Sequence, residues 1–155
     1  MAVERQRPYV QFNFLVKLGD NWNENDPFVG GFQECSNIGM EVTVAEYRNG
    51  SEKENCVRKI TGLNKATDVT LKRGVIGSLV LYEWLNAIRN GDNTSTNALR
   101  NVTISLMDEA QTQPVMTWKL FRTRIIKLVN GPFIAKGTDV AMEELTLSYE
   151  RLEME

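Results

Sequence analysis

Histidine is absent from the 155-residue sequence, and cysteine occurs only as Cys35 and Cys56. Histidine is the commonest general base and metal ligand, so its absence excludes Ser-His-Asp and Cys-His catalytic arrangements. A zinc site would need both thiolates together with carboxylates, which is an uncommon ligand set. One disulfide is compatible with the sequence, but two buried free thiols are the favoured interpretation.

Phosphate-binding motifs are also missing, because the chain has neither G-x-x-x-x-G-K-[ST] nor G-x-G-x-x-G. The isolated glycines of Gly30-Gly31 and Gly74-x-x-Gly77 favour structural roles. The carboxylate pair Asp108-Glu109 lies in a predicted turn, and Glu143-Glu144 point to opposite faces of a predicted strand. We interpret both pairs as solvated surface. We therefore expect no enzyme, with no catalytic residues, no cofactor and no metal site.

Long apolar runs and a strong net charge are lacking as well. No segment approaches the roughly 18 apolar residues of a membrane-spanning helix, and polar residues 1–8 lack the apolar run of a secretory signal. We therefore expect a protein that is made in the cytosol and stays soluble. The formal net charge is −2, from 18 Lys+Arg and 20 Asp+Glu, which argues against a dedicated nucleic-acid binder. A charge this small also opposes self-association only weakly.

The composition is that of an ordinary globular protein, with 42% hydrophobic and 25% charged residues. The length predicts a single domain over residues 1–155.

Alternation of apolar and polar residues predicts about eight strands. In the first predicted strand, 9–18, the inward side chains are Val10, Phe12, Phe14, Val16 and Leu18. Polar loops are expected at 19–27 and 92–98, and a hairpin turn at 108–111. Further strands are predicted at 28–35, 40–48, 56–60, 67–73, 102–106, 115–129 with a bend near 124, and 139–151, where Leu145, Leu147 and Tyr149 face inward.

One helix is predicted after the fifth strand. Leu81, Trp84, Leu85 and Ile88 form an apolar stripe with a 3.6-residue period, which we expect to cover a β core. Ser78 is the predicted N-cap and Gly91 the predicted stop. Because strands and helices do not alternate, the fold class is mainly β: a two-sheet antiparallel barrel or sandwich with one flanking helix.

Two charged segments remain to be explained. The polar loop 48–55 and the residues after it carry Arg48, Glu52, Lys53, Glu54, Arg58 and Lys59, mixed charges that suit contacts between identical copies. A solvated loop is the alternative. For Arg122, Arg124 and Lys127, a solvated or subunit-contacting face is favoured over a nucleic-acid contact.

Several segments, in order along nearly the whole chain, resemble the tail tube proteins of contractile bacteriophages and phage-like extracellular contractile injection systems. Residues 29–38, VGGFQECSNI, are similar to the family's G-F-x-E-x-S-G-L stretch. The other matching segments are YVQFNF (9–14), VAEYRNG (44–50), VRKITGL (57–63), VTLKRGV (69–75) leading to LYEW (81–84), and RNVTISLMDE (100–109) preceding PVMTW (114–118).

This resemblance implies a structural subunit that assembles into hexameric rings stacked as a tube. Its implied partners are other copies of itself, a contractile sheath protein, baseplate and tail terminator proteins, and DNA or protein cargo in the lumen. It also implies assembly in the bacterial cytoplasm and residence in a virion tail or released particle. The polar loop would reach the adjacent ring, so the candidate contact residues are Arg48, Asn49, Glu52, Lys53, Glu54, Arg58 and Lys59.

Two alternatives stay open at this stage. The chain could be an effector or adaptor that uses the same fold at the tip of a tube, in which case it would not polymerise. It could also be a small-molecule-binding barrel similar to lipocalins, which predicts a monomer with an apolar cavity.

Overall fold

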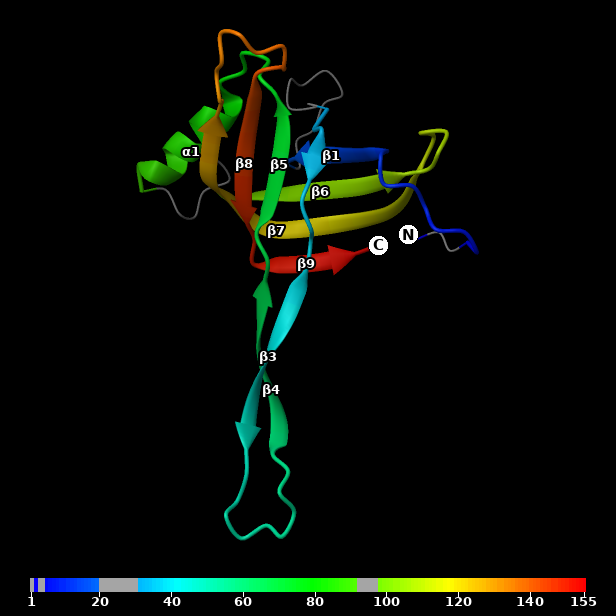
Figure 1. Ribbon diagram of the computed structural model, residues 1–155, viewed down its shortest axis with the longest axis vertical. Coiled ribbons are helices and arrows are strands. Elements are labelled where there is room, and N and C mark those ends of the chain that lie inside the picture. The colour runs from blue at the N-terminus through cyan, green and yellow to red at the C-terminus, as the bar shows by residue number, and fades with distance from the viewer. Residues whose placement is uncertain (1, 3–4, 20–30, 92–97) are drawn as a thin grey trace.

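The computed structural model describes residues 2, 5–19, 31–91 and 98–155. Within them the chain forms nine strands and one helix, in the arrangement drawn in Figure 1. The elements are β1 (Phe14–Leu18), β2 (Glu34–Cys35), β3 (Met40–Tyr47), β4 (Arg58–Ala66), β5 (Val69–Gly74), α1 (Val80–Arg89), β6 (Arg100–Met107), β7 (Pro114–Asn130), β8 (Met142–Ser148) and β9 (Arg151–Met154). Residues 20–27 of the predicted loop 19–27, residues 92–97 of the predicted loop 92–98, and the start of the predicted strand 28–35 lie outside the described residues.

The long strand β7 joins two halves of one antiparallel sheet. Its first part pairs with β6 and β9, and its second part pairs with β8, so the halves read β1-β6-β7-β9 and β7-β8-β5-β2. Arg122 has a positive φ of 52° between these two parts, and Asn101 accepts a hydrogen bond from its N–H at 3.4 Å. The predicted bend near residue 124 is thus confirmed. Because of it, the strands of the two halves run across one another in Figure 1.

The core fills the space between the two halves. The first half contributes Val16, Val102 and Leu120, and the second contributes Leu71 and Leu145, each less than 3% exposed. The predicted inward side chains Leu145, Leu147 and Tyr149 are all buried. Period-two burial along β5 and β8 follows from side chains that alternate between the faces of a strand.

Helix α1 covers the sheet with the predicted stripe. Leu81 and Trp84 are buried, and Leu85 and Ile88 pack against the core. Gly91 follows the helix with a φ of 94°, a left-handed conformation that favours glycine, so the predicted stop is confirmed. The predicted N-cap is wrong by one residue: Leu79 occupies the cap position, and Ser78 stands just outside it.

The first strand is shorter than predicted. It begins at Phe14, and Phe12 is 71% exposed instead of facing inward. The pairing with β6 ends at Phe14–Leu106, and beyond it the Met107 N–H donates to the Asn13 carbonyl at 2.9 Å. The residues before Asn13 therefore have no β6 residues opposite them with which to pair.

The expected fold class is confirmed, since the protein is mainly β and antiparallel with one flanking helix. The sheet is not closed into a barrel, however, and the bent arrangement is that of a sandwich. The second sheet contains only β3 and β4, which leave the body together.

Candidate assembly surface

Strands β3 and β4 form a hairpin, residues 40–66, that projects far from the body in Figure 1. We call it the arm. Its base is tied to the body at Gly39, whose carbonyl accepts hydrogen bonds from the Thr67 N–H at 3.0 Å and from the Tyr149 hydroxyl at 2.8 Å. Tyr149 is itself buried, so the arm leaves from a fixed point on the body.

The arm is exposed on both faces. Every residue of β3, and every residue of β4 except Ala66, is exposed. The exposed side chains include large apolar ones: Met40, Val42, Val44, Tyr47, Val57, Ile60 and Leu63. A two-stranded hairpin without a packed face is at best marginally stable in water. The arm therefore has the composition of an element that another surface covers.

A bulge in β4 explains why the alternation in the sequence predicted too early an end for this strand. The register shifts between Val42 and Val44, where Gly62 and Leu63 together face Thr43. A Cβ on Gly62 would lie 2.9 Å from the Thr43 hydroxyl oxygen, and that hydroxyl donates to the Leu63 carbonyl at 3.0 Å. The strand predicted to end at Ile60 continues to Ala66, because the bulge interrupts the alternation without ending the pairing.

Arg48 orders the loop at the tip of the arm. Its guanidinium donates to the Glu52 carbonyl at 3.0 Å and to the Glu54 carbonyl at 3.2 Å. The Glu52 carboxylate pairs with Arg58 across the loop at 3.1 Å and accepts from the Asn49 amide at 3.5 Å. These contacts give the exposed tip a defined shape.

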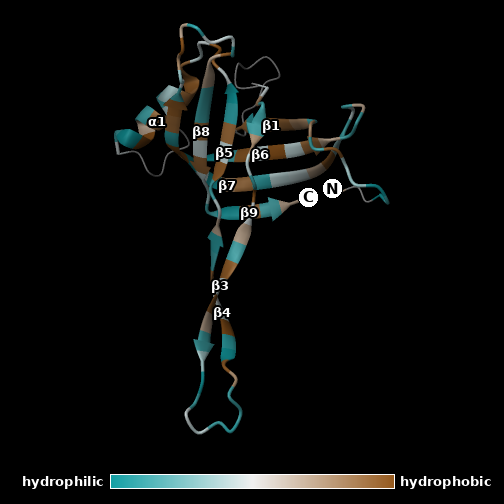
Figure 2. Ribbon diagram, in the orientation of Figure 1, coloured by the Kyte–Doolittle hydropathy of each residue, from teal (hydrophilic) through white to brown (hydrophobic). Residues whose placement is uncertain are grey.

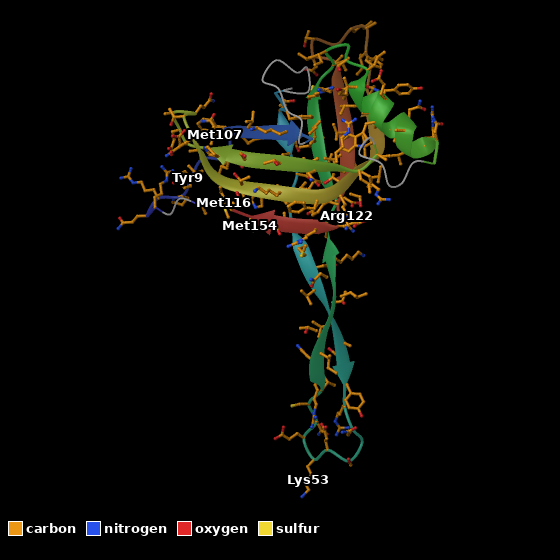
Figure 3. The ribbon with its side chains drawn as sticks, turned by 180° about the vertical axis from the view of Figure 1, so that it is seen from behind. Tyr9, Lys53, Met107, Met116, Arg122 and Met154 are labelled. Atoms are coloured by element: carbon orange, nitrogen blue, oxygen red, sulfur yellow. The ribbon has the colours of Figure 1, made fainter. Side chains whose placement is uncertain are left out.

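All seven predicted contact residues lie at this tip. Arg48, Asn49, Glu52, Lys53 and Glu54 are in the loop, and Arg58 and Lys59 begin β4. Lys53 lies at the far end and points away from the body (Figure 3). In the described part of the chain, the side chains of Lys53, Glu54 and Lys59 form no ion pair, so their charges are available to a partner.

Sheet edges are a second feature of an assembling subunit, and the sequence did not identify them. Among the described strands, β1 pairs only with β6, and β9 pairs only with β7. They are the two edges of the β1-β6-β7-β9 half, and the outer backbone groups of each are paired with no other described strand. Strand order comes from pairing between distant segments, which local periodicity does not report.

Two of the three basic residues predicted on β7 share one carboxylate within the chain. Arg122 and Arg124 both pair with Glu150, at 3.2 Å and 3.4 Å. Lys127 is exposed on the second part of β7. One carboxylate offsets one of these three positive charges, so this part of β7 stays basic, and both the subunit-contacting and the nucleic-acid interpretations remain predictions.

The two predicted carboxylate pairs have different roles. Asp108 caps the 108–111 turn by accepting from the Thr112 N–H at 2.7 Å, and Glu109 pairs with Arg5 at 2.6 Å. Glu144 faces outward near Lys72, as expected. Glu143 was expected at the solvated surface, but it is buried, because its face of β8 is the core face and Arg73 on β5 pairs with it there.

The described residues offer no arrangement for metal chemistry. No group of three His, Cys, Asp or Glu side chains among them is placed to hold an ion.

Both cysteines are free. Burial raises the pKa of Cys35 to about 11. Cys56 is exposed on the arm, so the expectation of two buried thiols is wrong for this residue. Among the described helices, none is both long and apolar enough to cross a membrane.

A β body in which the described strands β1 and β9 are open edges, together with a protruding, uncovered hairpin, is typical of a structural subunit that is completed by assembly. The family model of the T4-like virus tail tube protein gp19 matches residues 10–153. The chain therefore belongs to this family, the tail tube proteins of contractile phage and phage-like injection systems. No curated protein sequence matches the chain significantly.

Solved structures support the same assignment. A chain in the extended sheath–tube complex of the PVC extracellular contractile injection system is 28% identical, with a TM-score of 0.77 over 97% of this chain and 93% of that one. A chain in the six-fold symmetrised baseplate of the anti-feeding prophage is 26% identical, with a TM-score of 0.80 over 97% of both chains. An Hcp protein at 13% identity shares the fold alone, with a TM-score of 0.54 over 92% of this chain and 97% of the other.

Proposed function

We propose that this protein is the inner-tube subunit of a contractile particle and that it assembles into hexameric rings stacked as a hollow tube. The observation that carries the proposal is the arm, which is exposed along its length although it bears large apolar side chains. Family membership and the structures with TM-scores of 0.77 and 0.80 support it. The protein has no catalytic activity of its own in this role.

Ring closure uses the two open edges. Strand β1 of one copy pairs with β9 of the next, which extends the β1-β6-β7-β9 half into a continuous barrel around a lumen. Such a contact joins two different surfaces, and repeating it about a rotation axis closes a ring. The backbone groups left unpaired at each edge then acquire partners.

Ring stacking uses the tip of the arm. Arg48, Asn49, Glu52, Lys53, Glu54, Arg58 and Lys59 contact the adjacent ring, and the unpaired Lys53 and Glu54 meet opposite charges there. The internal bonds of Arg48 support this role, because an ordered tip loses less conformational entropy on docking.

The further partners are a contractile sheath, a baseplate and a tube terminator. Similar chains occur in a PVC sheath–tube complex, a PVC sheath/tube terminator and an anti-feeding prophage baseplate. Cargo, either DNA or protein, passes through the lumen. Assembly takes place in the bacterial cytoplasm, and the finished tube belongs to a virion tail or a released particle.

Negative-stain electron microscopy of the purified protein tests this function, and we expect stacked rings or tubes. The triple variant Glu52→Lys, Lys53→Glu, Glu54→Lys should give separate rings with a folded body. Glu83→Lys on α1 raises the net charge by the same amount at a distant exposed site and should leave tubes intact. Normal tubes from the triple variant would show that the tip of the arm does not take part in the contact between rings. A protein that stays single at high concentration and beside its baseplate would contradict the tube function and match the adaptor or barrel alternatives.

A further inference from the structure

The strands of the β1-β6-β7-β9 half end at two opposite surfaces of the body. At one of them β1 begins beside the end of β6, and the β6–β7 turn (108–113) lies at the same end in Figure 1. At the other, β7 bends at Arg122 and β9 begins at Arg151. Figure 3 shows Tyr9 and Met107 near the first surface and Arg122 at the second. We call them the turn end (residues 5–12 and 108–113) and the bend end (Arg122, Arg124 and Glu150).

These two surfaces face along the tube axis in a ring that closes as proposed. Pairing of β1 with β9 places neighbouring copies side by side in the direction of strand order, so the strand order runs around the ring. The strands of a closed barrel are tilted, but each runs from one rim of the barrel to the other. The turn end and the bend end therefore lie at opposite rims, where successive rings meet.

Hydrogen bonds and an ion pair hold the turn end in a defined shape. Arg5 donates to the Arg7 carbonyl at 2.7 Å and pairs with Glu109 of the turn at 2.6 Å. The Asn13 amide donates to the Asp108 carbonyl at 3.3 Å. These contacts fasten the segment before β1 to the turn. A surface ordered in this way loses less conformational entropy when it docks.

The turn end presents a large apolar side chain near a negative charge. Phe12, which precedes Asn13, is 71% exposed. In the part of the chain that the structure describes, Asp108 forms no ion pair. Arg7 is exposed on the same segment and is likewise without an ion pair among the described residues. An aromatic ring and a carboxylate close together suit a guanidinium, which binds both kinds of group.

The bend end offers such a guanidinium. Arg122 and Arg124 share the single carboxylate of Glu150, so this surface keeps an excess of positive charge. The Arg122 side chain is 72% exposed. Its φ of 52° is a left-handed conformation that is uncommon for a residue other than glycine, and residues held in this way are concentrated at functional positions.

We propose that Arg122 of one ring contacts Phe12 and Asp108 of a second copy of this chain in the adjacent ring. The guanidinium stacks on the Phe12 ring and pairs with the Asp108 carboxylate. This contact depends on the proposed tube function and adds an aromatic stacking surface, whereas the tip of the arm is largely hydrophilic (Figure 2). The turn end of every ring then meets the bend end of the next, which gives the tube a single direction.

Charge reversal tests the contact in the assembled protein. Arg122→Asp should leave rings intact but shorten tubes at least tenfold in electron micrographs, because Asp108 would then meet a like charge. Aspartate adopts the left-handed conformation more readily than most residues, so the bend is retained. Adding Asp108→Lys should restore most of the tube length. Lys127→Asp makes the same change in charge at an exposed site on the second part of β7, and this matched control should form normal tubes.

Cysteine crosslinking measures the same contact directly. Phe12→Cys and Arg122→Cys are combined in a Cys35→Ser, Cys56→Ser background, and the assembled protein is treated with a short bismaleimide. The strand from Pro114 to Arg122 spans about 25 Å, so the reagent should not join the two ends of one chain. Denaturing gels should show a ladder that extends beyond six chains, because each chain is linked to the rings on both sides. Either cysteine alone is the control and should give single chains.

The results distinguish this contact from the tube function. A ladder from the double-cysteine variant alone, together with short tubes that the second charge reversal restores, supports the contact. Normal tubes from Arg122→Asp, or double-cysteine tubes without a ladder, overturn it while the tube function stands. If Arg122→Asp forms no rings, the crosslink alone decides. If the unmodified chain forms no tube, both the tube function and the contact fail.

Discussion

Arg73 on β5 and Glu143 on the neighbouring β8 form an ion pair in which both side chains are buried. The guanidinium also lies over the Phe32 ring, 5.5 Å from its centre, and its Nη1 has no hydrogen-bond partner among the described residues. Two charges in the interior stabilise one another only while both are present. The pair therefore holds the ends of β5 and β8 in an orientation in which these two side chains point into the core, next to the segment 75–79 that leads to α1.

Glu143→Gln should destabilise the unassembled protein by about 3–5 kcal/mol, because it leaves the Arg73 charge buried without its counterion. Urea unfolding followed by tryptophan fluorescence measures the loss. The double variant Arg73→Met, Glu143→Leu is the control and should regain most of the stability, since it removes both charges together. If the single variant is as stable as the parent, the pair contributes little to the fold.

The sequence predicted the elements whose pattern is local and regular. The stripe of Leu81 and Trp84 identified α1, and alternation identified the inward residues of β8, because one face of each element is buried and the other is not. The alternation wrongly predicted that Phe12 faces inward, because β6 ends before it could pair with that residue. It also failed for β4, because the bulge at Gly62 breaks the alternation.

Long-range pairing explains the remaining differences. Sequence alone did not show that the face of β8 bearing Glu143 is the core face, since that depends on Arg73 across the sheet. The open edges β1 and β9 likewise follow from strand order. The candidate contact residues were found together because they are contiguous along one loop and the strand after it. Their contact with another copy stays a prediction.

Arg5 should be the cause of the low pKa of Glu109. The Arg5 guanidinium donates to that carboxylate at 2.6 Å and 3.1 Å, and this hydrogen bonding lowers its pKa. Because the pKa is lowered in the folded state, the ionised carboxylate stabilises the folded protein at any pH above the ordinary glutamate pKa of about 4.3. This stabilisation is lost as the pH falls through the lower pKa that Glu109 has in the folded protein. An NMR titration of an assembly-blocked variant should show Glu109 titrating below that range, and Arg5→Ala should return it to the ordinary range.

Asp108 is the internal control for that titration. Its pKa is lowered by hydrogen bonds from Thr112, so it should keep its low value in Arg5→Ala. A Glu109 pKa that does not change in Arg5→Ala would show that the residues around Arg5 do not pack against the β6–β7 turn in solution.

The two cysteines should differ strongly in reactivity. Cys35 is half-buried with a pKa of about 11, so at pH 8 only about one thiol in a thousand is ionised. Cys56 is exposed, and in the unassembled protein it should react first with a thiol reagent. Assembly should then slow Cys56 at least tenfold, because the proposed contacts cover the arm. Cys56→Ser is the control that identifies the fast phase, and equal rates in monomers and tubes would show that the arm stays uncovered.

Met154→Pro should prevent ring closure while the body stays folded. The Glu155 N–H and carbonyl bond with Thr117 at 2.8 Å, so in this antiparallel ladder the next residue, Met154, directs its N–H away from β7. Proline removes that outward donor but no bond to β7, and it is tolerated on edge strands. Loss of one such bond together with steric hindrance should raise the concentration needed for rings about tenfold or more, as measured by analytical ultracentrifugation. Met154→Ala keeps the donor and should assemble normally, whereas rings from the proline variant at parental concentrations would exclude β9 as the closing edge.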